Sequence, residues 1–331
     1  MMLTTLLSVL LLAASTTAAP TTTAEDDDKV YVKDDFYPSN LAIYTAEHEI
    51  VSILAPINDI NFGEDSNEES KDHPIIFFAL ADFNEKGERT DQGLFVLDNG
   101  AVKKLLDNGR DSTADGGDNK IVYFGAKDGL YDYDHLKNTA NKFGTVTDSI
   151  VQLSKLNNTH DLYILTEDKH IYKVTNEGTN KVEVSESNGA DQIAVDFADN
   201  LYYSKDSKLY IYKNETTKEV ALPSEGKLKL IRPPFVMDNG IFCLINDDLY
   251  SVNENGTTET TDFIIKSKPS AYAIDSGLLH YYGFNKKIYE YNLVSLLVEG
   301  FFQALEEIIE QNKDKIEAIA VRSKNELGDL I

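Results

Sequence analysis

Short apolar segments separated by polar turns recur along most of the chain. One pattern consists of an apolar residue, an aromatic residue, any residue and a second apolar residue. Its six copies begin at Leu94, Leu130, Ile171, Leu209, Leu249 and Ile288. The aromatic positions 95, 131, 172, 210, 250 and 289 lie 36 to 41 residues apart. A repeat at this spacing predicts an array of similar structural units.

Each repeat predicts four short β-strands. In the clearest copy they cover residues 193–196, 201–204, 209–212 and 219–222, and in the next copy 234–238, 241–244, 249–252 and 262–265. These segments are rich in β-branched and aromatic residues, and Asn, Asp, Gly and Lys separate them. They lack the 3.6-residue spacing of a helical repeat. Four strands in each repeat are typical of a propeller blade, and an open β-solenoid is the alternative.

The ends of the array suggest how the ring closes. The last repeat offers strands at 271–275, 278–282 and 288–291 but no fourth strand of the same kind. Residues Glu49–Leu54 have strand character just before the first repeat. We therefore predict an all-β, six-bladed β-propeller over residues 41–294, closed by an N-terminal strand, Glu49–Leu54, that pairs with 288–291. The second blade is irregular, because residues 107–119 are rich in Gly and Asp.

Three further segments lie outside the predicted propeller. Residues 1–18 read as a signal peptide, with an apolar stretch too short to span a bilayer and small residues before a cleavage point after Ala18. Residues 19–40 are polar and acidic and predict a flexible lead-in. Residues 295–331 predict a C-terminal amphipathic α-helix that packs on the ring or binds a protein partner.

Charge and cysteine content narrow the possible partners and the compartment. The chain has 31 Lys and Arg against 56 Asp and Glu, a net charge of −25. Nucleic acids and anionic membranes attract clustered cations, so we expect neither as a partner. Cys243, the one cysteine, lies in an apolar run and predicts a buried, inert thiol. Glycosylation sequons at Asn157, Asn214 and Asn255 fit a secreted, extracellular protein.

Motifs for catalysis or for metal binding are weak. The sequence has no Gly-x-Ser-x-Gly elbow and no His-Glu-x-x-His motif, and its six histidines are scattered. Asp196, Asp238 and Asp275 end the predicted first strands of three blades, where oxygen ligands could hold calcium. Aspartate at such a position is also a common turn former, and we favour that reading. We expect no catalytic residues, no metal and no cofactor.

A cluster of cations is the best candidate for ligand binding. Residues 227–235 concentrate positive charge in an acidic protein and lead toward a predicted inner strand. An anionic aromatic ligand needs a charge partner and a stacking surface. We therefore predict ligand contacts from Lys229, Arg232 and Phe235, with Tyr272 at the matching place in the next blade. The alternative is an ordinary solvated loop.

The predicted leader and repeats such as Leu201-Tyr202-Tyr203-Ser204 resemble insect ommochrome-binding proteins. The resemblance covers about residues 41–294, and its motifs are shared with NHL-type and SMP-30-type propellers. It implies an extracellular, haemolymph-type, non-catalytic carrier of a small molecule such as an ommochrome-like pigment. Two alternatives stay open: a secreted protein–protein interaction propeller and a calcium-dependent, lactonase- or esterase-like hydrolase.

Overall fold

The computed structural model describes residues 29–62, 74–157, 159–232, 239–273, 279–292 and 313. The chain divides into a unit of residues 24–291 and a second unit of residues 1–23 and 292–331. In the second unit the described residues are Asn292, which ends the last strand, and Lys313, which is helical. The predicted signal peptide and nearly all of the predicted C-terminal helix lie outside the described residues.

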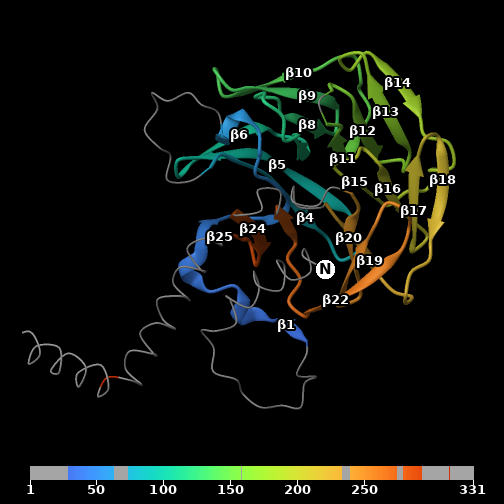
Figure 1. Ribbon diagram of the computed structural model, residues 1–331. Helices are drawn as coiled ribbons and strands as arrows, with labels where there is room; N and C mark the ends of the chain where they lie inside the picture. The colour runs from blue at the N-terminus through green and yellow to red at the C-terminus, as the bar shows by residue number, and fades with distance from the viewer. Residues whose placement is uncertain are drawn as a thin grey trace, which may run out of the picture. The chain divides into compact units, whose positions relative to one another are not determined.

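Six sheets of mainly antiparallel strands make up the unit of residues 24–291, and we number them as blades 1 to 6 (Figure 1). Blade 1 contains β3 (Glu49–Leu54), β4 (Ile76–Phe83), β5 (Arg89–Asp98) and β6 (Ala101–Leu106). Blade 2 contains β7 (Gly109–Thr113), β8 (Tyr123–Ala126), β9 (Gly129–Asp134) and β10 (Thr139–Lys142). Blade 3 contains β11 (Ile150–Lys155), β12 (Leu162–Thr166), β13 (Ile171–Thr175) and β14 (Asn180–Glu183).

Blade 4 contains β15 (Gln192–Val195), β16 (Leu201–Lys205), β17 (Lys208–Lys213) and β18 (Thr216–Val220). Blade 5 contains β19 (Leu228–Ile231), β20 (Ile241–Ile245), β21 (Asp248–Val252), β22 (Thr258–Ile265) and the N-terminal β1 (Val30–Val32). Blade 6 contains β23 (Ala271–Ala273), β24 (Leu279–Phe284), β25 (Lys287–Asn292) and β2 (Ala42–Thr45). Short helices η1 (Asp34–Phe36), η2 (Ser39–Leu41) and α2 (Asp59–Phe62) lie in connections.

The first strands of the blades form an inner ring. Strands β3, β7, β11, β15 and β19 each contact the next, and β23 contacts β3. The Tyr272 hydroxyl of β23 donates a 2.7 Å hydrogen bond to the Leu230 carbonyl of β19, which completes the circuit. The sequence prediction of an all-β, six-bladed propeller is thus confirmed. All six repeat aromatics lie on the third strand of a blade, as the periodicity predicts.

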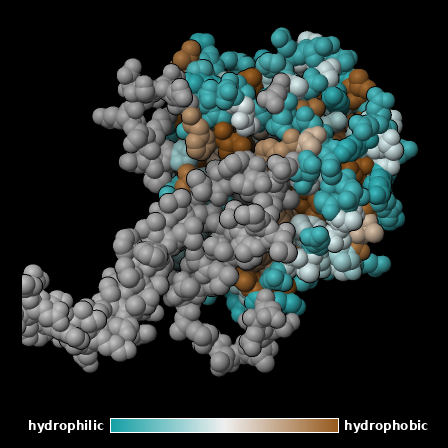
Figure 2. Space-filling model, in the orientation of Figure 1, coloured by the Kyte–Doolittle hydropathy of each residue, from teal (hydrophilic) through white to brown (hydrophobic). Residues whose placement is uncertain are grey.

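The hydrophobic core lies between neighbouring blades rather than at the centre of the ring. Tyr202 of blade 4 and Cys243 of blade 5 are fully buried in one such cluster, and Phe77 and Phe124 pack between blades 1 and 2. Polar residues predominate on the outer strands β14 and β18, although Val182 of β14 is exposed. Hydrophilic residues predominate among the coloured atoms on the face shown in Figure 2. Among the described residues, no helix has the length and apolar character needed to cross a bilayer.

The N-terminal strand that joins the last blade differs from the predicted one. Strand β2 pairs antiparallel with β25, so Ala42–Thr45 is the outermost strand of blade 6. Glu49–Leu54, which we predicted in that place, pairs with β4 as the inner strand of blade 1, so the prediction is wrong. Ile50 is fully buried and Leu54 is 1% exposed, which suits an inner strand. An outer strand needs less burial, and no residue of β2 is fully buried.

Part of the predicted flexible lead-in is also ordered, so that prediction is wrong from Lys29 on. Strand β1 pairs in parallel with β22 and extends blade 5. The Phe36 ring then stacks on Tyr291 at 4.8 Å between ring centres, and the Tyr37 ring stacks on Phe284 at 4.1 Å. Aromatic packing of this kind stabilises a segment whose acidic composition alone predicts mobility.

The inner strand of blade 5 also lies earlier than predicted. It is β19 (Leu228–Ile231), and the predicted strand, residues 234–238, lies outside the described residues. In β19 the buried Leu228 and Leu230 alternate with the less buried Lys229 and Ile231. This alternation is that of a strand, although its lysine and the following Arg232 resemble a solvated loop in the sequence.

Candidate ligand site in the central channel

The inner strands surround a cavity of about 140 Å³ in the central channel. Every blade contributes to its wall. One lining residue from each inner strand, in blade order, is Ser52, Asp111, Gln152, Gln192, Lys229 and Tyr272. Among the described lining residues the charged groups are Asp111, Lys229 and Arg232. The cavity wall therefore carries two cations against one carboxylate.

Polar side chains of three inner strands reach the backbone of the next blade. The Asp111 carboxylate accepts a 3.0 Å hydrogen bond from the Leu153 amide. Gln152 Oε1 accepts from the Ile193 amide at 2.9 Å, and Gln192 Oε1 accepts from the Leu230 amide at 3.0 Å. These bonds satisfy backbone groups that the free edge of an inner strand would otherwise leave without a partner.

Lys229 lies in a sheltered part of this cavity. Its Nζ donates to the carbonyls of Pro269 and Ser270 at 3.1 and 3.3 Å, and it lies 5.0 Å from the centre of the Tyr272 ring. No carboxylate among the described residues forms an ion pair with it. Burial lowers the pKa of Lys229 to about 8, and the charges of Lys227 and Lys268 contribute. Among the described residues, no carboxylate therefore balances the positive charge of the Lys229 ammonium group.

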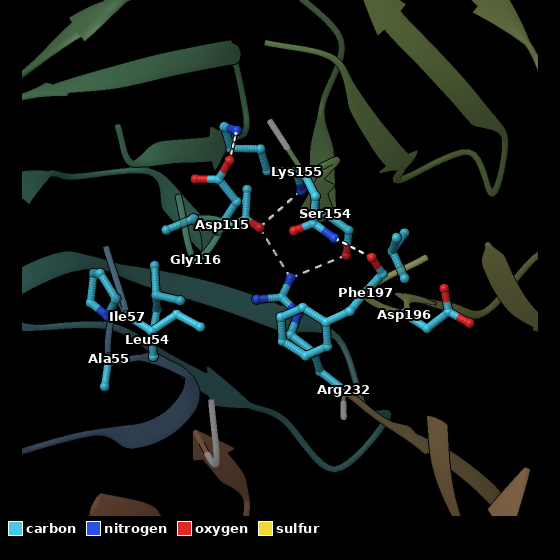
Figure 3. Close-up of a pocket in the computed structure, with 15 residues that line it drawn as sticks. Leu54, Ala55, Ile57, Asp115, Gly116, Ser154, Lys155, Asp196, Phe197 and Arg232 are labelled. Carbon is cyan, nitrogen blue, oxygen red and sulfur yellow. Dashed lines mark hydrogen bonds and ion pairs between the residues drawn. The ribbon is translucent and has the colours of Figure 1, made fainter. Parts of the chain in front are cut away.

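Arg232 follows β19 and extends across the channel. Its Nη2 donates to Thr113 Oγ1 at 3.2 Å in blade 2, and to Ser154 Oγ and the Leu153 carbonyl at 3.1 and 3.2 Å in blade 3. All three acceptors are neutral oxygens. Arg232 also lines a second cavity of about 40 Å³, shown in Figure 3. Its guanidinium group therefore lies between the two spaces.

The second cavity combines apolar residues with a buried ion pair. Lys155 Nζ lies 2.5 Å from Asp115 Oδ2, and both side chains are 1% exposed. Leu54, Ala55 and Phe197 lie around the same space (Figure 3). Because Lys155 already has a carboxylate partner, it offers less to an anionic ligand than Lys229 does.

Burial also affects the other polar groups of the channel. It raises the pKa of the Asp111 carboxyl, although the Ser52 hydroxyl, which donates to Asp111 at 2.6 Å, and the charge of Arg232 act in the opposite direction. Burial likewise raises the pKa of the Tyr272 hydroxyl, which therefore stays protonated as a donor to Leu230.

Three of the four predicted ligand residues line the channel. Lys229 and Tyr272 are in contact with each other, and Arg232 lines the same cavity. Phe235 lies outside the described residues. Asp111, Gln152 and Gln192 also line the channel, and they were not among the predicted ligand residues. These three residues recur at intervals of about 40 residues, and each has a side chain that can accept a hydrogen bond. Each directly precedes the inner-strand residue that lies in register with the repeat aromatic of its blade.

Asp196 is a turn former, as we expected. Its carboxylate accepts hydrogen bonds from the amides of Ala198, Asn200 and Gly240 and from the Tyr202 hydroxyl, at 2.9 to 3.0 Å. Asp238 and Asp275 lie outside the described residues. Within the described part of the chain, no group of three or more His, Cys, Asp or Glu side chains is placed to hold a metal ion.

The cysteine and the sequons occupy different environments. Cys243 is fully buried, which confirms the expected burial, and burial raises the pKa of its thiol to about 12, as expected of an unreactive thiol. Asn214 and Asn255 are exposed. Asn157 is half-buried beside the second cavity, and its Nδ2 donates to the Phe197 carbonyl at 2.7 Å. Glycosylation at the three sites stays a prediction.

Comparisons with known proteins give a distant relative. No protein-family model matches the chain. Over 125 residues it is 28% identical to an ommochrome-binding protein of Manduca sexta, a match that covers 35% of this chain and 45% of that protein. The chain therefore matches less than half the length of this relative.

Solved structures match at low similarity. PorZ of Porphyromonas gingivalis is 12% identical with a TM-score of 0.47, over 76% of this chain and 38% of that chain. A protein proposed to be a gluconolactonase is 10% identical with a TM-score of 0.48, over 75% of this chain and 90% of that chain. Likeness at this level carries no information on function.

Proposed function

We propose that this protein is a secreted, non-catalytic carrier of a small anionic aromatic molecule, of the ommochrome pigment type, which binds at the central channel. The observation that carries the proposal is the half-buried Lys229 ammonium, which has carbonyl and ring contacts but no carboxylate partner in the part of the chain that the structure describes. An anionic ligand would supply the missing charge. The ommochrome-binding relative supports the choice of ligand class.

The size of the cavity limits how much of the ligand it can hold. Pockets that enclose a drug-sized molecule usually measure roughly 300–1,000 Å³. The channel cavity, at about 140 Å³, is smaller, and Arg232 lines both this cavity and the second one. We therefore expect the anionic group of the ligand to enter the channel while its aromatic body lies at the mouth.

The test is to purify the protein from its native source and to record its absorbance and mass spectra. A carrier retains a ligand with an absorbance band beyond that of tyrosine. Purified ommochrome pigment is then titrated into the ligand-free protein and into the Lys229→Gln variant. Lys227→Gln is the matched control, because Lys227 carries the same charge two residues away but is exposed. A colourless protein that also fails to bind added pigment overturns the proposal.

A further inference from the structure

Each inner strand has a backbone amide at a regularly repeated position that faces the channel. In an antiparallel ladder, every second residue turns its N–H and C=O away from the partner strand. An inner strand has no second neighbour in its sheet, so these groups face the channel. In each blade the residue concerned lies in register, through the second strand, with the repeat aromatic of the third strand. These residues are Ile53, Ser112, Leu153, Ile193, Leu230 and Tyr272.

Three of the six amides donate to a side-chain acceptor of the preceding blade. Asp111 accepts from Leu153, Gln152 accepts from Ile193, and Gln192 accepts from Leu230. These side chains accept hydrogen bonds from inner-strand amides that would otherwise bond to water in the channel.

The series stops at the next two blades. The position that Gln192 occupies in blade 4 is Lys229 in blade 5, and its ammonium cannot accept a hydrogen bond. The same position in blade 6 is Ala271, which has no polar side chain. Among the described residues no side chain therefore accepts from the amides of Tyr272 and Ile53, whereas Asp111, Gln152 and Gln192 accept at the matching places in other blades.

These two amides and Lys229 lie on the same side of the channel. Ile53, Tyr272 and Lys229 line one cavity, and β23 contacts both β3 and the Lys229 side chain. Neighbouring backbone amides that lack acceptors form an anion site, and an adjacent ammonium strengthens it. A carboxylate, with two acceptor oxygens, matches such a donor set.

We propose that the channel holds a carboxylate site, in which the amides of Tyr272 and Ile53 and the Lys229 ammonium bind one carboxylate of an aromatic acid. This inference rests on the proposed carrier function and names the group that the carrier recognises. Arg232 does not belong to the site, because its Nη2 group bonds to blades 2 and 3. The Asp111 carboxylate is already occupied by Ser52 and Leu153.

The test uses benzoate as the probe, with benzyl alcohol as the same ring without a carboxylate. Protein labelled with ¹⁵N-tyrosine and ¹⁵N-isoleucine is titrated at pH 7 and followed by NMR. The peak absent from Tyr272→Phe identifies Tyr272, and the peak absent from Ile53→Val identifies Ile53. We expect benzoate, but not benzyl alcohol, to shift both amide peaks, in the wild type and in Lys227→Gln.

Two substitutions of Lys229 distinguish the contribution of the ammonium charge to benzoate binding from that of the backbone amides. Lys229→Met removes the ammonium and should weaken benzoate binding roughly ten- to a hundred-fold. Lys229→Gln also supplies the acceptor found in blades 3 and 4, so the Tyr272 amide should be hydrogen-bonded without ligand and should not respond to benzoate. Both variants should keep the remaining amide pattern, which reports an intact fold.

Several results would overturn the carboxylate site: no benzoate binding, binding that shifts neither amide, or equal affinity in the wild type and Lys229→Gln. If pigment binds while benzoate does not, this inference fails and the carrier function stands. If benzoate shifts both amides and weakens in the Lys229 variants while no pigment binds, the carboxylate site stands and the proposed ligand class fails.

Discussion

The side-chain amide of Gln192 forms two hydrogen bonds with the backbone of β19, one at Leu230 and one at Leu228. Its Oε1 accepts from the Leu230 amide, and its Nε2 donates to the Leu228 carbonyl, both at 3.0 Å. One side chain of blade 4 thereby joins the inner strands of blades 4 and 5 at the channel wall. The hydrophobic cluster between the same blades supplies the rest of the contact.

Replacing Gln192 by Met should destabilise the propeller. The change keeps the length of the side chain but leaves a donor and an acceptor of β19 unpaired, at a cost of about 1–3 kcal/mol in the free energy of unfolding. Urea denaturation of the variant measures this cost. Gln92→Met is the control, because Gln92 bonds to the exposed Asp82 side chain and should change the free energy by less than about 1 kcal/mol. Equal effects of the two substitutions would contradict the role of Gln192.

Lys229→Gln should make the protein more stable at neutral pH. The pKa of Lys229 is about 8 in the folded state and 10.5 in the reference state, so the folded protein carries an unfavourable buried charge below pH 8. Removing that charge should raise the free energy of unfolding by roughly 1–3 kcal/mol at pH 7. Between pH 8 and 10.5 the unfolded chain binds more protons, so the wild type gains stability as pH rises.

Urea denaturation at pH 7, 8, 9 and 10 tests this expectation. The advantage of Lys229→Gln should shrink as pH rises from 8 to 10. A variant that is less stable than the wild type at pH 7 would show that Lys229 stabilises the fold. An advantage that does not change with pH would show that the charge of Lys229 is not its cause. Lys227→Gln should differ from the wild type by less than about 0.5 kcal/mol at every pH.

Benzoate binding should weaken above pH 8. The anion favours charged Lys229 and raises its pKa in the complex, so affinity is constant below pH 8 and falls as pH rises above this value. Calorimetry in buffers of different ionisation enthalpy should detect proton uptake near pH 8 to 9. In Lys229→Arg the cation persists to high pH, so the loss of affinity should disappear. A wild-type affinity that stays flat to pH 10 would remove Lys229 from the site.

Arg232→Ala should weaken pigment binding even though Arg232 lies outside the carboxylate site. Arg232 supplies positive charge to the channel and lines both of its cavities. Loss of a sheltered, charge-assisted interaction should cost about 1.5–3 kcal/mol in pigment affinity. Titration of pigment, with circular dichroism to check the fold, measures the difference. Equal affinities with an intact fold would show that Arg232 acts only as a structural link.

The sequence predicts the third strands of all six blades, because their aromatic residues repeat at a regular spacing. It does not predict β19, since Lys229 and Arg232 use polar contacts across the channel that a local hydrophobic pattern cannot reveal. It also misplaces the strand that joins blade 6. Strand β2 is short and only partly buried, whereas the next segment, Glu49–Leu54, has the stronger apolar signal.

For the candidate site, composition points to Lys229, Arg232 and Tyr272, because cations beside an aromatic residue are unusual in this acidic chain. The missing acceptors in blades 5 and 6 have no local signal. Lys229 and Ala271 become informative only when they are aligned with Gln152 and Gln192 through the strand register. A site formed by backbone amides depends on topology, and residue type gives no direct evidence for it.

The attachment of the N-terminal segment to the last two blades has a consequence for biosynthesis. Tyr37 donates a hydrogen bond to the Ser267 carbonyl, 230 positions later in the chain, and β1 and β2 pair with β22 and β25. Closing so long a loop is entropically costly, and contacts distant in sequence slow folding. Strands that leave the ribosome early must therefore wait, unpaired, until the final blades have been translated. During this interval we expect the nascent chain to expose open sheet edges, which makes aggregation a greater risk than for a protein that folds from local contacts.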